Sequence, residues 1–343
     1  MIFPSKTTII GSRSGHPLKM NPSQSSPGSS SNSTQGLLQG VSVIIVTYEA
    51  QLSALEQLLI CLRDDGVQGL AVDNASTNQG EIKKLVTNYG FEFITSPENQ
   101  GVAAAHNRGI AWAKTQHANY VVLLDQDSVP ESGSIGNLLA AYNALPNKHG
   151  ISAVGSRYVL PDGKSSSSFV RFGWFRFVKV YCDHDSNPLP QVDFLISSGT
   201  LFPMAVLDAV GPMKEELFID HVDTDWFLRA RSLGYTAYGC CQSKLKHALG
   251  ERTLRIWLGR WRTIPIHKNF RYFFMFRNSL WLYRQSYAPI KWISGDIVRL
   301  LYIFLFSGLL VSSGRKNIAC MISGIRAGIG QLKPAPFQIN HFK

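Results

Sequence analysis

Two glycine-rich phosphate-binding signatures are missing from this chain of 343 residues. Neither the dinucleotide fingerprint G-x-G-x-x-G nor the P-loop pattern G-x-x-x-x-G-K-[ST] occurs. The sequence therefore gives no support for a nicotinamide-dependent dehydrogenase or a P-loop nucleotide hydrolase. With 45% apolar and 17% charged residues, most of the chain is nevertheless expected to be globular.

Cysteine is scarce, and no pair has the C-x-x-C spacing of a metal site or redox motif. This spacing predicts neither a zinc site nor a disulfide framework. The N-terminus also lacks the basic, apolar and cleavage segments of a secretory signal. We therefore expect a cytosolic protein with reduced thiols at all five positions. These are Cys61, Cys182, Cys240, Cys241 and Cys320.

Acidic residues are almost absent from the last third of the chain. Residues 241–343 carry 17 Lys and Arg against 2 Asp and Glu, whereas residues 1–240 carry 17 against 21, so that +15 and −4 give the net charge of +11. This asymmetry favours an anionic partner surface, either anionic lipid or nucleic acid. Aromatic residues and an apolar run accompany the charge and no nucleic-acid motif occurs, so lipid is favoured and no nucleic-acid partner is expected.

No apolar run is long enough for a confident membrane span. Residues 300–314 are uncharged, but a spanning helix needs about 20 apolar residues. Residues 251–262 place Leu254 and Trp257 on one helical face and arginines on another, which predicts a basic amphipathic helix at a bilayer interface. We expect residues 251–343 to form a basic, aromatic, helical region in peripheral (monotopic) contact with an anionic membrane. Two alternatives to this peripheral contact are a buried core helix with a solvated basic face and a helix that spans the membrane.

The rest of the chain has two textures. Residues 1–39 are rich in Ser, Asn, Gln, Gly and Pro, which predicts a disordered tail. From residue 40 onward, apolar β-like runs alternate with segments of helical spacing. This alternation predicts an α/β fold with a mostly parallel sheet and flanking helices. We expect strands at 41–48, 69–74, 91–94, 120–124 and 192–196, and helices at 52–63, 79–88, 102–115 and from 220 to about 231.

Polar clusters follow three of the expected strands. Ligands of parallel sheets bind beyond the carboxyl ends of the strands. The clusters are Thr47-Tyr48-Glu49, Asp73-Asn74 and Asp125-Gln126-Asp127. The two carboxylates of Asp125 and Asp127 are hard oxygen ligands that suit Mg²⁺ or Mn²⁺ on a diphosphate. Asp73-Asn74 could contact a base and a ribose, or form a simple turn.

The segment from Asn99 to Gly109 opens a helix with small residues, Gly101-Val102-Ala103-Ala104-Ala105. Small side chains let a ligand or another backbone approach closely. Asn107 and Arg108 could then reach a phosphate or a sugar. Tight packing of the helix on the sheet is the alternative.

A second acidic cluster contains Asp220, Asp223 and Asp225. On a helix, Asp220 and Asp223 share a face, whereas Asp225 lies four residues before Arg229 and is expected to form a structural ion pair. Asp223 is thereby left for chemistry. On its own, His247 is more often a surface or core histidine than a ligand.

Taken in order, these motifs resemble the inverting glycosyltransferases of family 2 with the GT-A fold. The similarity is greatest to bacterial rhamnosyltransferases of O-antigen and related polysaccharide assembly, and it covers about residues 40–285. The motifs are Val-Ile-Ile-Val-Thr-Tyr, Val-Asp-Asn-Ala-Ser, Asn-Gln-Gly-Val-Ala-Ala-Ala-His-Asn-Arg-Gly, Leu-Leu-Asp-Gln-Asp-Ser, Ser-Ser-Gly-Thr and Asp-His-Val-Asp-Thr-Asp-Trp-Phe-Leu-Arg. Many family members have Glu-Asp where this chain has Val222-Asp223, which puts the acceptor contacts in question.

The resemblance implies a catalytic domain over 40–250, with a nucleotide-binding half (40–128) and an acceptor half (129–250). It implies Asp223 as the general base and a metal site of Asp125, Asp127 and His247. Residues implied in binding the nucleotide sugar are Thr47, Tyr48, Glu49, Asp73, Asn74, Asn99, Gly101, Asn107, Asp125, Gln126 and Asp127. Residues implied on the acceptor side are Ser198, Gly199, Thr200, Asp220 and Trp226.

The implied reaction moves L-rhamnose from dTDP-β-L-rhamnose to a polyprenyl-diphosphate-linked saccharide at the cytoplasmic side of the inner membrane. Another donor, such as UDP-galactofuranose, UDP-GlcNAc or a different hexose nucleotide, would keep the fold and the mechanism. An inactive scaffold that only binds a sugar nucleotide is the alternative of another class.

Overall fold

The computed structural model describes residues 38–159, 167–182, 187–247, 252–257, 261–311 and 313–330. Almost all of the predicted N-terminal tail (1–39) therefore lies outside the described residues, as does the last part of the C-terminal region. Of His247 and of the segments 252–257 and 261–266, only the backbone is described.

The first part of the fold is an alternation of strands and helices, as the sequence predicts. The order is β1 (Val41–Thr47), α2 (Leu52–Asp64), β2 (Gln68–Asp73), α3 (Gln79–Asn88), β3 (Glu92–Thr95), α4 (Gly101–Thr115) and β4 (Tyr120–Asp125). The four strands pair in parallel in the order β3-β2-β1-β4. Their apolar runs are buried on both faces, which is why β1, β2 and β4 read as nearly continuous β-branched segments.

The second part extends this sheet beyond β4. Strand β10 (Thr200–Pro203) runs antiparallel between β4 and β6 (Ile151–Val159), and β11 (Thr236–His247) is parallel to β6. Because β10 is antiparallel to both β4 and β6, these two strands point the same way. The carboxyl end of β6 therefore lies at the same edge of the sheet as that of β4. The short strands β5 (Ser128–Pro130) and β9 (Gln191–Val192) pair antiparallel with β11.

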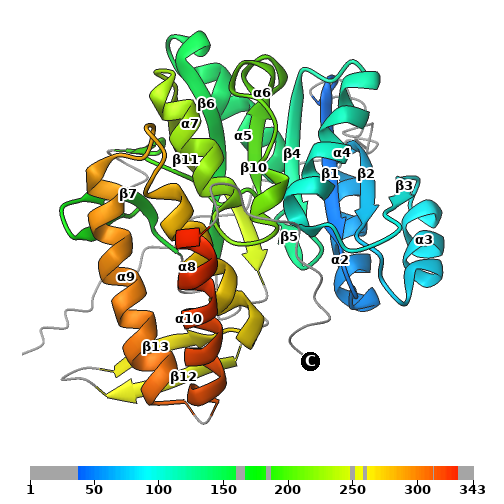
Figure 1. The fold of residues 1–343 in the computed structure, drawn as a ribbon. Coiled ribbons are helices and arrows are strands. Elements are labelled where there is room, and N and C mark those ends of the chain that lie inside the picture. The colour runs from blue at the N-terminus through cyan, green and yellow to red at the C-terminus, as the bar shows by residue number, and fades with distance from the viewer. Residues whose placement is uncertain are drawn as a thin grey trace, which may run out of the picture.

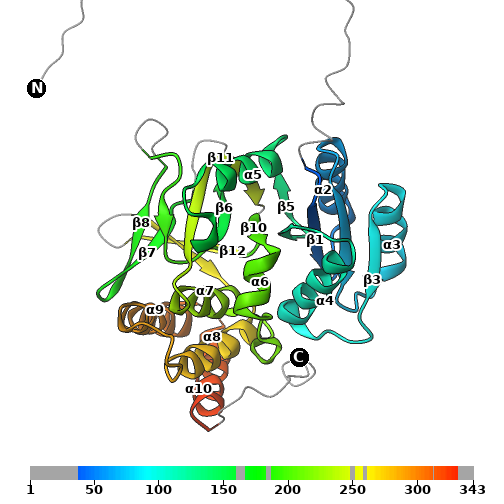
Figure 2. The same cartoon turned by 90° about the horizontal axis from the view of Figure 1, so that it is seen from above.

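Helices cover both faces of the sheet (Figures 1 and 2). One core contains side chains of α2, α3 and of α5 (Ser134–Ala144), together with Ile45 of β1. The other contains side chains of α4, of α6 (Met204–Val210) and of α7 (Val222–Ser232), together with Ile44. Adjacent residues of one strand thus enter opposite cores, as the period of two requires.

Two segments differ from the prediction. The expected strand at 192–196 contributes only Gln191–Val192 to the sheet, and the residues after it form a loop. Its apolar residues reflect burial rather than strand pairing, because Leu195 packs into the core. The small residues after this loop form a turn at Ser198-Gly199 that leads into β10, and Gly199 has a φ of +70°.

The predicted amphipathic helix at 251–262 is wrong. The backbone forms an antiparallel hairpin of β12 (Arg252–Trp257) and β13 (Trp261–Ile266), paired from Arg252–Ile266 to Trp257–Trp261. The β-branched and aromatic residues of this segment favour strands, and their spacing fits an alternating pattern as well as a helical one. A second hairpin, β7 (Phe169–Gly173) and β8 (Arg176–Val180), lies beside the main sheet.

The β12–β13 hairpin is followed in the chain by the helices α8 (Asn269–Leu282), α9 (Ile290–Leu309) and α10 (Gly314–Gly330). Helices α8 and α10 pack closely because Gly324 and Gly328 face α8, where an added Cβ would overlap the carbonyl oxygens of Phe273 and Arg277. Among the described residues, α9 alone is long and apolar enough to cross a membrane by length and composition.

The expectation of five reduced thiols is also wrong, because Cys182 and Cys241 form a disulfide. The two residues are 59 positions apart, so no local spacing reveals the pair. Folding brings them together, since the backbone N–H of Cys241 donates to the carbonyl of Pro188.

Candidate functional site

The carboxyl ends of β1 and β4 are joined by one side chain. The amide of Gln126 accepts a hydrogen bond from the backbone N–H of Tyr48 (2.7 Å) and donates to the carbonyl of Tyr48 (3.1 Å). The Asp125-Gln126-Asp127 turn is therefore held against the end of β1, as the strand-end argument predicts. Because both ends of the Gln126 amide are engaged, this residue positions the turn.

Asp73 lies at the end of β2 and is fully buried. Its carboxylate accepts hydrogen bonds from Thr47 Oγ1 (2.9 Å), from Ser76 Oγ (2.6 Å) and from the backbone N–H of Ser76 (2.9 Å). The structure thus brings Thr47 and Asp73 together, as expected for one binding edge. Nearby, the backbone and hydroxyl of Thr77 donate to Glu49, and these bonds lower the pKa of that carboxyl.

Asn74 and Asn99 bond to one another at the start of α4. Asn74 Nδ2 donates to Asn99 Oδ1 (2.9 Å), and Asn99 Oδ1 also accepts from the backbone N–H of Gly101 (3.0 Å). Gly101 has φ +87°, and a Cβ there would overlap the carbonyl of Phe218. The small residues of this segment were expected to admit either a ligand or another backbone. In the structure, the backbone of the loop before α7 lies against Gly101.

Asn107 bonds to the segment that follows α6. Its side chain donates to the carbonyl of Met213 (2.9 Å) and to Glu215 Oε1 (2.8 Å), and it accepts from the backbone N–H of Met213 (2.9 Å). Asn107 thereby secures the segment that leads to Asp223, and its expected contact with phosphate or sugar stays a prediction.

The two acidic clusters meet at the loop Ser197-Ser198. Ser198 Oγ accepts from the backbone N–H of Asp125 (2.9 Å). The carboxylate of Asp223 accepts from the backbone of Ser197 and from the backbone N–H of Thr224, the latter at 2.7 Å. One short loop thus fixes the first aspartate of the D-x-D turn and the predicted base, which are far apart in the sequence.

Tyr158 completes this junction, and sequence reasoning missed it. The tyrosine lies at the carboxyl end of β6, and its hydroxyl donates to the carbonyl of Ser198 (2.5 Å). Burial raises the pKa of Tyr158 well above its ordinary value, and the charges of Asp125, Asp223 and Asp127 raise it further. The strand-end rule that selected the other residues would have selected Tyr158, had the sequence shown where β6 ends.

Asp223 lies in the first turn of α7 and is half-buried. Burial raises the pKa of its carboxyl to about 6, against the hydrogen bonds from Thr224 and Ser197, which lower it, and with the charge of Asp220, which raises it. A carboxylate with such a pKa is ionised near neutral pH and is a stronger base than an ordinary aspartate.

The neighbouring aspartates have structural partners. Asp225 is fully buried and accepts hydrogen bonds from Arg229 Nε (2.9 Å) and from the hydroxyl of Tyr287 (2.6 Å), so its predicted ion pair is confirmed. Asp220 precedes α7 with φ +61° and pairs with Arg271 Nη2 (2.7 Å). The premise that Asp220 and Asp223 share a helical face is therefore wrong, because α7 begins at Val222.

Trp226 is fully buried as well. Its indole N–H donates to the carbonyl of Gly211 (3.1 Å), and its ring packs edge-on against Phe202. The tryptophan thus belongs to the core under α7, and its expected contact with an acceptor stays a prediction.

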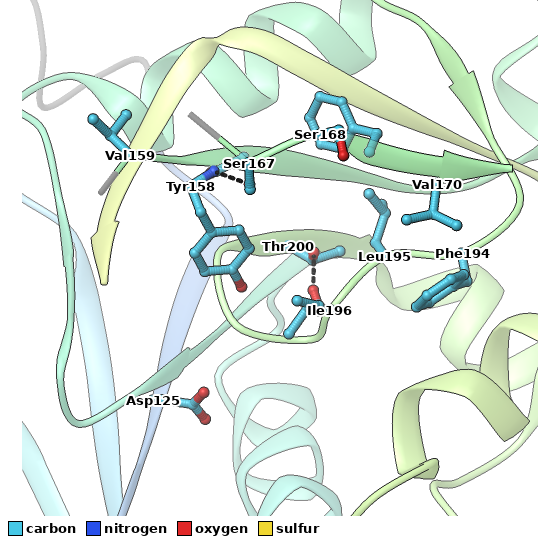
Figure 3. Close-up of a pocket in the computed structure, with 12 residues that line it drawn as sticks. Asp125, Tyr158, Val159, Ser167, Ser168, Val170, Phe194, Leu195, Ile196 and Thr200 are labelled. Atoms are coloured by element: carbon cyan, nitrogen blue, oxygen red, sulfur yellow. Dashed lines mark hydrogen bonds between the residues drawn. The ribbon is translucent and has the colours of Figure 1, made fainter. Parts of the chain in front are cut away.

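A cavity of about 290 Å³ opens beside Asp125. In Figure 3, Asp125 lies below the other labelled residues that line the cavity, and the ring of Tyr158 lies above it. The wall is mainly apolar, and hydroxyl groups of serine, threonine and tyrosine interrupt it. Of the residues expected on the acceptor side, Thr200 lines the cavity, whereas Ser198 and Gly199 build the loop beneath it. The lining is Asp125, Ser156, Tyr158, Val159, Ser167, Ser168, Phe169, Val170, Phe194, Leu195, Ile196 and Thr200.

The residues that could hold a divalent cation come from adjacent strands. His247 of β11 is in register with Ser128 of β5, which directly follows Asp127. Among side chains that the structure describes, no group of three His, Cys, Asp or Glu residues has metal-binding geometry, but the side chain of His247 is not among them. Two carboxylates and an imidazole on neighbouring strands are a donor set that fits Mg²⁺ or Mn²⁺.

Known proteins resemble this chain in sequence and in fold. Residues 42–208 match the model of the family "Glycosyl transferase family 2". The chain is 27% identical over 292 residues to "dTDP-rhamnosyl transferase RfbF" of Shigella flexneri, and the match covers 84% of this chain and 94% of that protein.

Solved structures show the same fold at low sequence identity. TarS of S. aureus, residues 1–349, has a TM-score of 0.51 at 14% identity, covering 83% of this chain and 80% of that one. The same fragment solved with UDP-GlcNAc has a TM-score of 0.50 at 15% identity, covering 84% and 81%. This chain spans 49% of the longer TarS structure. The mixed α/β architecture is therefore GT-A-like.

Proposed function

We propose that this chain, a glycosyltransferase with a family 2 domain over residues 42–208, transfers L-rhamnose from dTDP-β-L-rhamnose to a saccharide hydroxyl with inversion. The observation that carries the proposal is the junction at Ser197-Ser198. It places the backbone of Asp125 and the carboxylate of Asp223 on one loop, so that a donor diphosphate and a base could act on the same sugar.

In the proposed reaction, Asp223 accepts the proton of the acceptor hydroxyl while that oxygen attacks the anomeric carbon. The bond from the anomeric carbon to the diphosphate oxygen breaks, and dTDP leaves with the electron pair. Attack from the face opposite the diphosphate converts the β-linked donor into an α-L-rhamnoside. Asp125, Asp127 and His247 would hold a divalent cation, which would offset the charge that develops on the leaving diphosphate.

The roles of the remaining residues follow from their positions. Thr47, Tyr48, Glu49, Asp73, Asn74 and Asn99 would form the nucleoside side of the site, at the ends of β1 and β2 and the start of α4. Thr200 and the cavity beside Asp125 would receive a sugar. The apolar wall of that cavity supports a 6-deoxy sugar, because a methyl group gains from apolar contact where a hydroxymethyl group would lose hydrogen bonds to water.

The identity of the donor rests on two observations, the apolar cavity and the similarity to a dTDP-rhamnosyl transferase. Another sugar nucleotide would use the same fold and the same base. A lipid-linked saccharide is the acceptor that we propose, at the cytoplasmic face of a membrane, because the C-terminal third is basic and presents an apolar helix.

A donor screen tests this proposal. The full chain with Mg²⁺ would be offered dTDP-rhamnose, UDP-galactofuranose, UDP-GlcNAc and GDP-mannose, with thermal stabilisation and slow donor hydrolysis as readouts. We expect selective stabilisation by dTDP-rhamnose, lost in Asp127→Ala and retained in Asp208→Ala, a surface aspartate of α6.

Each other outcome has a defined meaning. Selective stabilisation by another donor would replace the sugar and leave the fold and base in place. Stabilisation without hydrolysis, even with saccharide acceptors added, would favour the inactive scaffold. No stabilisation by any donor would refute the proposal.

A further inference from the structure

Helix α9 exposes a continuous apolar stripe. Ile297, Leu301 and Leu305 follow one another at four-residue intervals, and Val298 and Leu309 lie beside them on the same side of the helix. Their exposed fractions range from 43% to 64%. Single exposed apolar residues are common on protein surfaces, but a stripe along a whole helix marks an interaction surface.

The opposite side of α9 is fixed to the protein. Trp292, Asp296 and Leu300 are buried on this side. On the side of the stripe, about one turn before Ile297, Ser294 accepts a hydrogen bond from the backbone N–H of Phe175 (3.1 Å). In Figure 1, α9 lies in the left part of the molecule with α10 to its right, and it contacts α10 and both strands of the β7–β8 hairpin. The helix is thus long enough to span a bilayer but is attached along its length, which favours a position parallel to a membrane surface.

The tip of the β7–β8 hairpin extends the stripe. Trp174 and Phe175 are 57% and 66% exposed, and Lys291 Nζ at the start of α9 lies 5.9 Å from the centre of the Trp174 ring. Tryptophan and lysine are the side chains that concentrate at the boundary between lipid tails and headgroups.

The charge around the stripe has a single sign. Asp296 is the only acidic residue between 267 and 330, and it is buried and paired with Arg299 Nε at 2.7 Å. Lys291, Arg315 and Lys316 are exposed around the helix ends. An anionic surface complements this pattern, whereas a second copy of the chain would bring like charges together.

We propose that the α9 stripe, together with Trp174 and Phe175, is the surface that docks on an anionic lipid bilayer. The inference deepens the membrane placement in the proposed function and takes its purpose from it.

The docked orientation has a consequence for the site. Arg299 on the inner side of α9 lies 2.9 Å from His221 Nε2, and His221 is two residues before Asp223. A bilayer in contact with α9 therefore lies on the side of the protein from which the proposed base is supported.

Vesicle flotation tests the docking surface. Full-length protein would be mixed with vesicles of equal parts phosphatidylglycerol and phosphatidylethanolamine, and with vesicles of phosphatidylcholine alone. We expect binding to the anionic vesicles and loss of about tenfold or more in affinity for the double variant Leu301→Glu, Leu305→Glu. The control Leu233→Glu changes a residue of matched exposure, 58% against 59% for Leu301, at the end of α7, and should bind as the wild type does.

Two results would overturn the inference. One is a double variant that floats like the wild type. The other is that the wild type sediments as a dimer and the double variant as a monomer, which would assign the stripe to a second copy of the chain. Hydrolysis of dTDP-rhamnose in the absence of vesicles should be equal in wild type and double variant, and its absence from both would refute the proposed function while leaving the docking result intact.

Discussion

Asp223 differs from the other aspartates of its cluster in what surrounds it. Asp225 is held by a guanidinium and a phenol, and Asp220 by a guanidinium. Asp223 accepts hydrogen bonds from the backbone of Thr224 and of Ser197, and burial is the largest influence on its pKa. A carboxylate held in this way keeps its orientation without an adjacent cation that would weaken it as a base.

The pH dependence of the reaction tests this environment. Asp223 must be ionised to accept a proton, and burial raises its pKa to about 6. We expect kcat/KM for dTDP-rhamnose hydrolysis to be constant above that pH and to fall about tenfold per unit below it. An acid limb centred near 4 would show that the carboxyl is not desolvated as described.

The variant Asp223→Asn tests whether Asp223 is the group whose protonation lowers kcat/KM at acid pH. It should retain donor binding in the thermal-shift assay and lower kcat by about a hundredfold or more, because an amide accepts no proton. Asp208→Asn, on the surface of α6, is the control and should leave both quantities unchanged. Near-normal hydrolysis by Asp223→Asn would assign the base to another residue.

Single residues were predictable where local spacing determines the partner. The i, i+4 spacing of Asp225 and Arg229 was sufficient to separate a structural aspartate from a free one. Asn107 and Trp226 were not predictable in this way, because their partners, Met213 and Gly211, lie in segments that meet them only after folding. A polar residue inside a motif has the same appearance in the sequence whether it binds a ligand or a backbone carbonyl.

At the scale of elements, the strand ends β4 and β6 and the loop Ser197-Ser198 form the framework of the site. Tyr158 connects β6 to this loop through one hydrogen bond to the carbonyl of Ser198. Because the same loop bonds to Asp125 and Asp223, loss of the tyrosine hydroxyl should loosen both together. Tyr158 is thus a positioning residue in this arrangement.

Tyr158→Phe tests that role. We expect the free energy of unfolding to fall by about 1 kcal/mol and kcat to fall about tenfold, with little change in KM for the donor. Tyr142→Phe is a matched control, because Tyr142 belongs to α5, away from the site, and its hydroxyl donates to the carbonyl of Lys148 (3.3 Å). Equal effects of both substitutions on kcat would show that the loss is one of general stability.

Elements were predictable to the extent that burial gave them a clear period. Strands β1, β2 and β4 are buried on both faces and gave unbroken apolar runs, so they were placed within a residue or two. Residues 252–266 carry a pattern that suits a helix and a hairpin alike. The loop after β9 is apolar because it lines a cavity and contacts the core, so its composition imitated a strand.

At the scale of the whole molecule, the segment 213–221 is held from two sides. On one side, Asn107 bonds to Met213, and Gly101 admits the carbonyl of Phe218. On the other, Asn278 of α8 donates to the carbonyls of Leu217 (3.0 Å), Ile219 (2.9 Å) and Asp220 (2.9 Å). The C-terminal helices therefore complete the loop that leads into Asp223, which the charge pattern of the sequence could not show.

Asn278→Ala tests whether these helices support the site. The substitution removes the side-chain donor from the carbonyls of Ile219 and Asp220, whereas the carbonyl of Leu217 still accepts from Arg277 Nη2 (3.2 Å) and from the backbone N–H of Ile219 (2.7 Å). We expect the free energy of unfolding to fall by about 2–3 kcal/mol. We also expect kcat for donor hydrolysis to fall about tenfold, because the residues before Asp223 lose their backbone support. Asn317→Ala is a matched control, since Asn317 is equally buried and donates to the carbonyl of Ser307 (2.7 Å) between α9 and α10. It should destabilise the fold and leave kcat near normal at temperatures where the protein is folded, whereas a normal kcat in Asn278→Ala would separate the helices from catalysis.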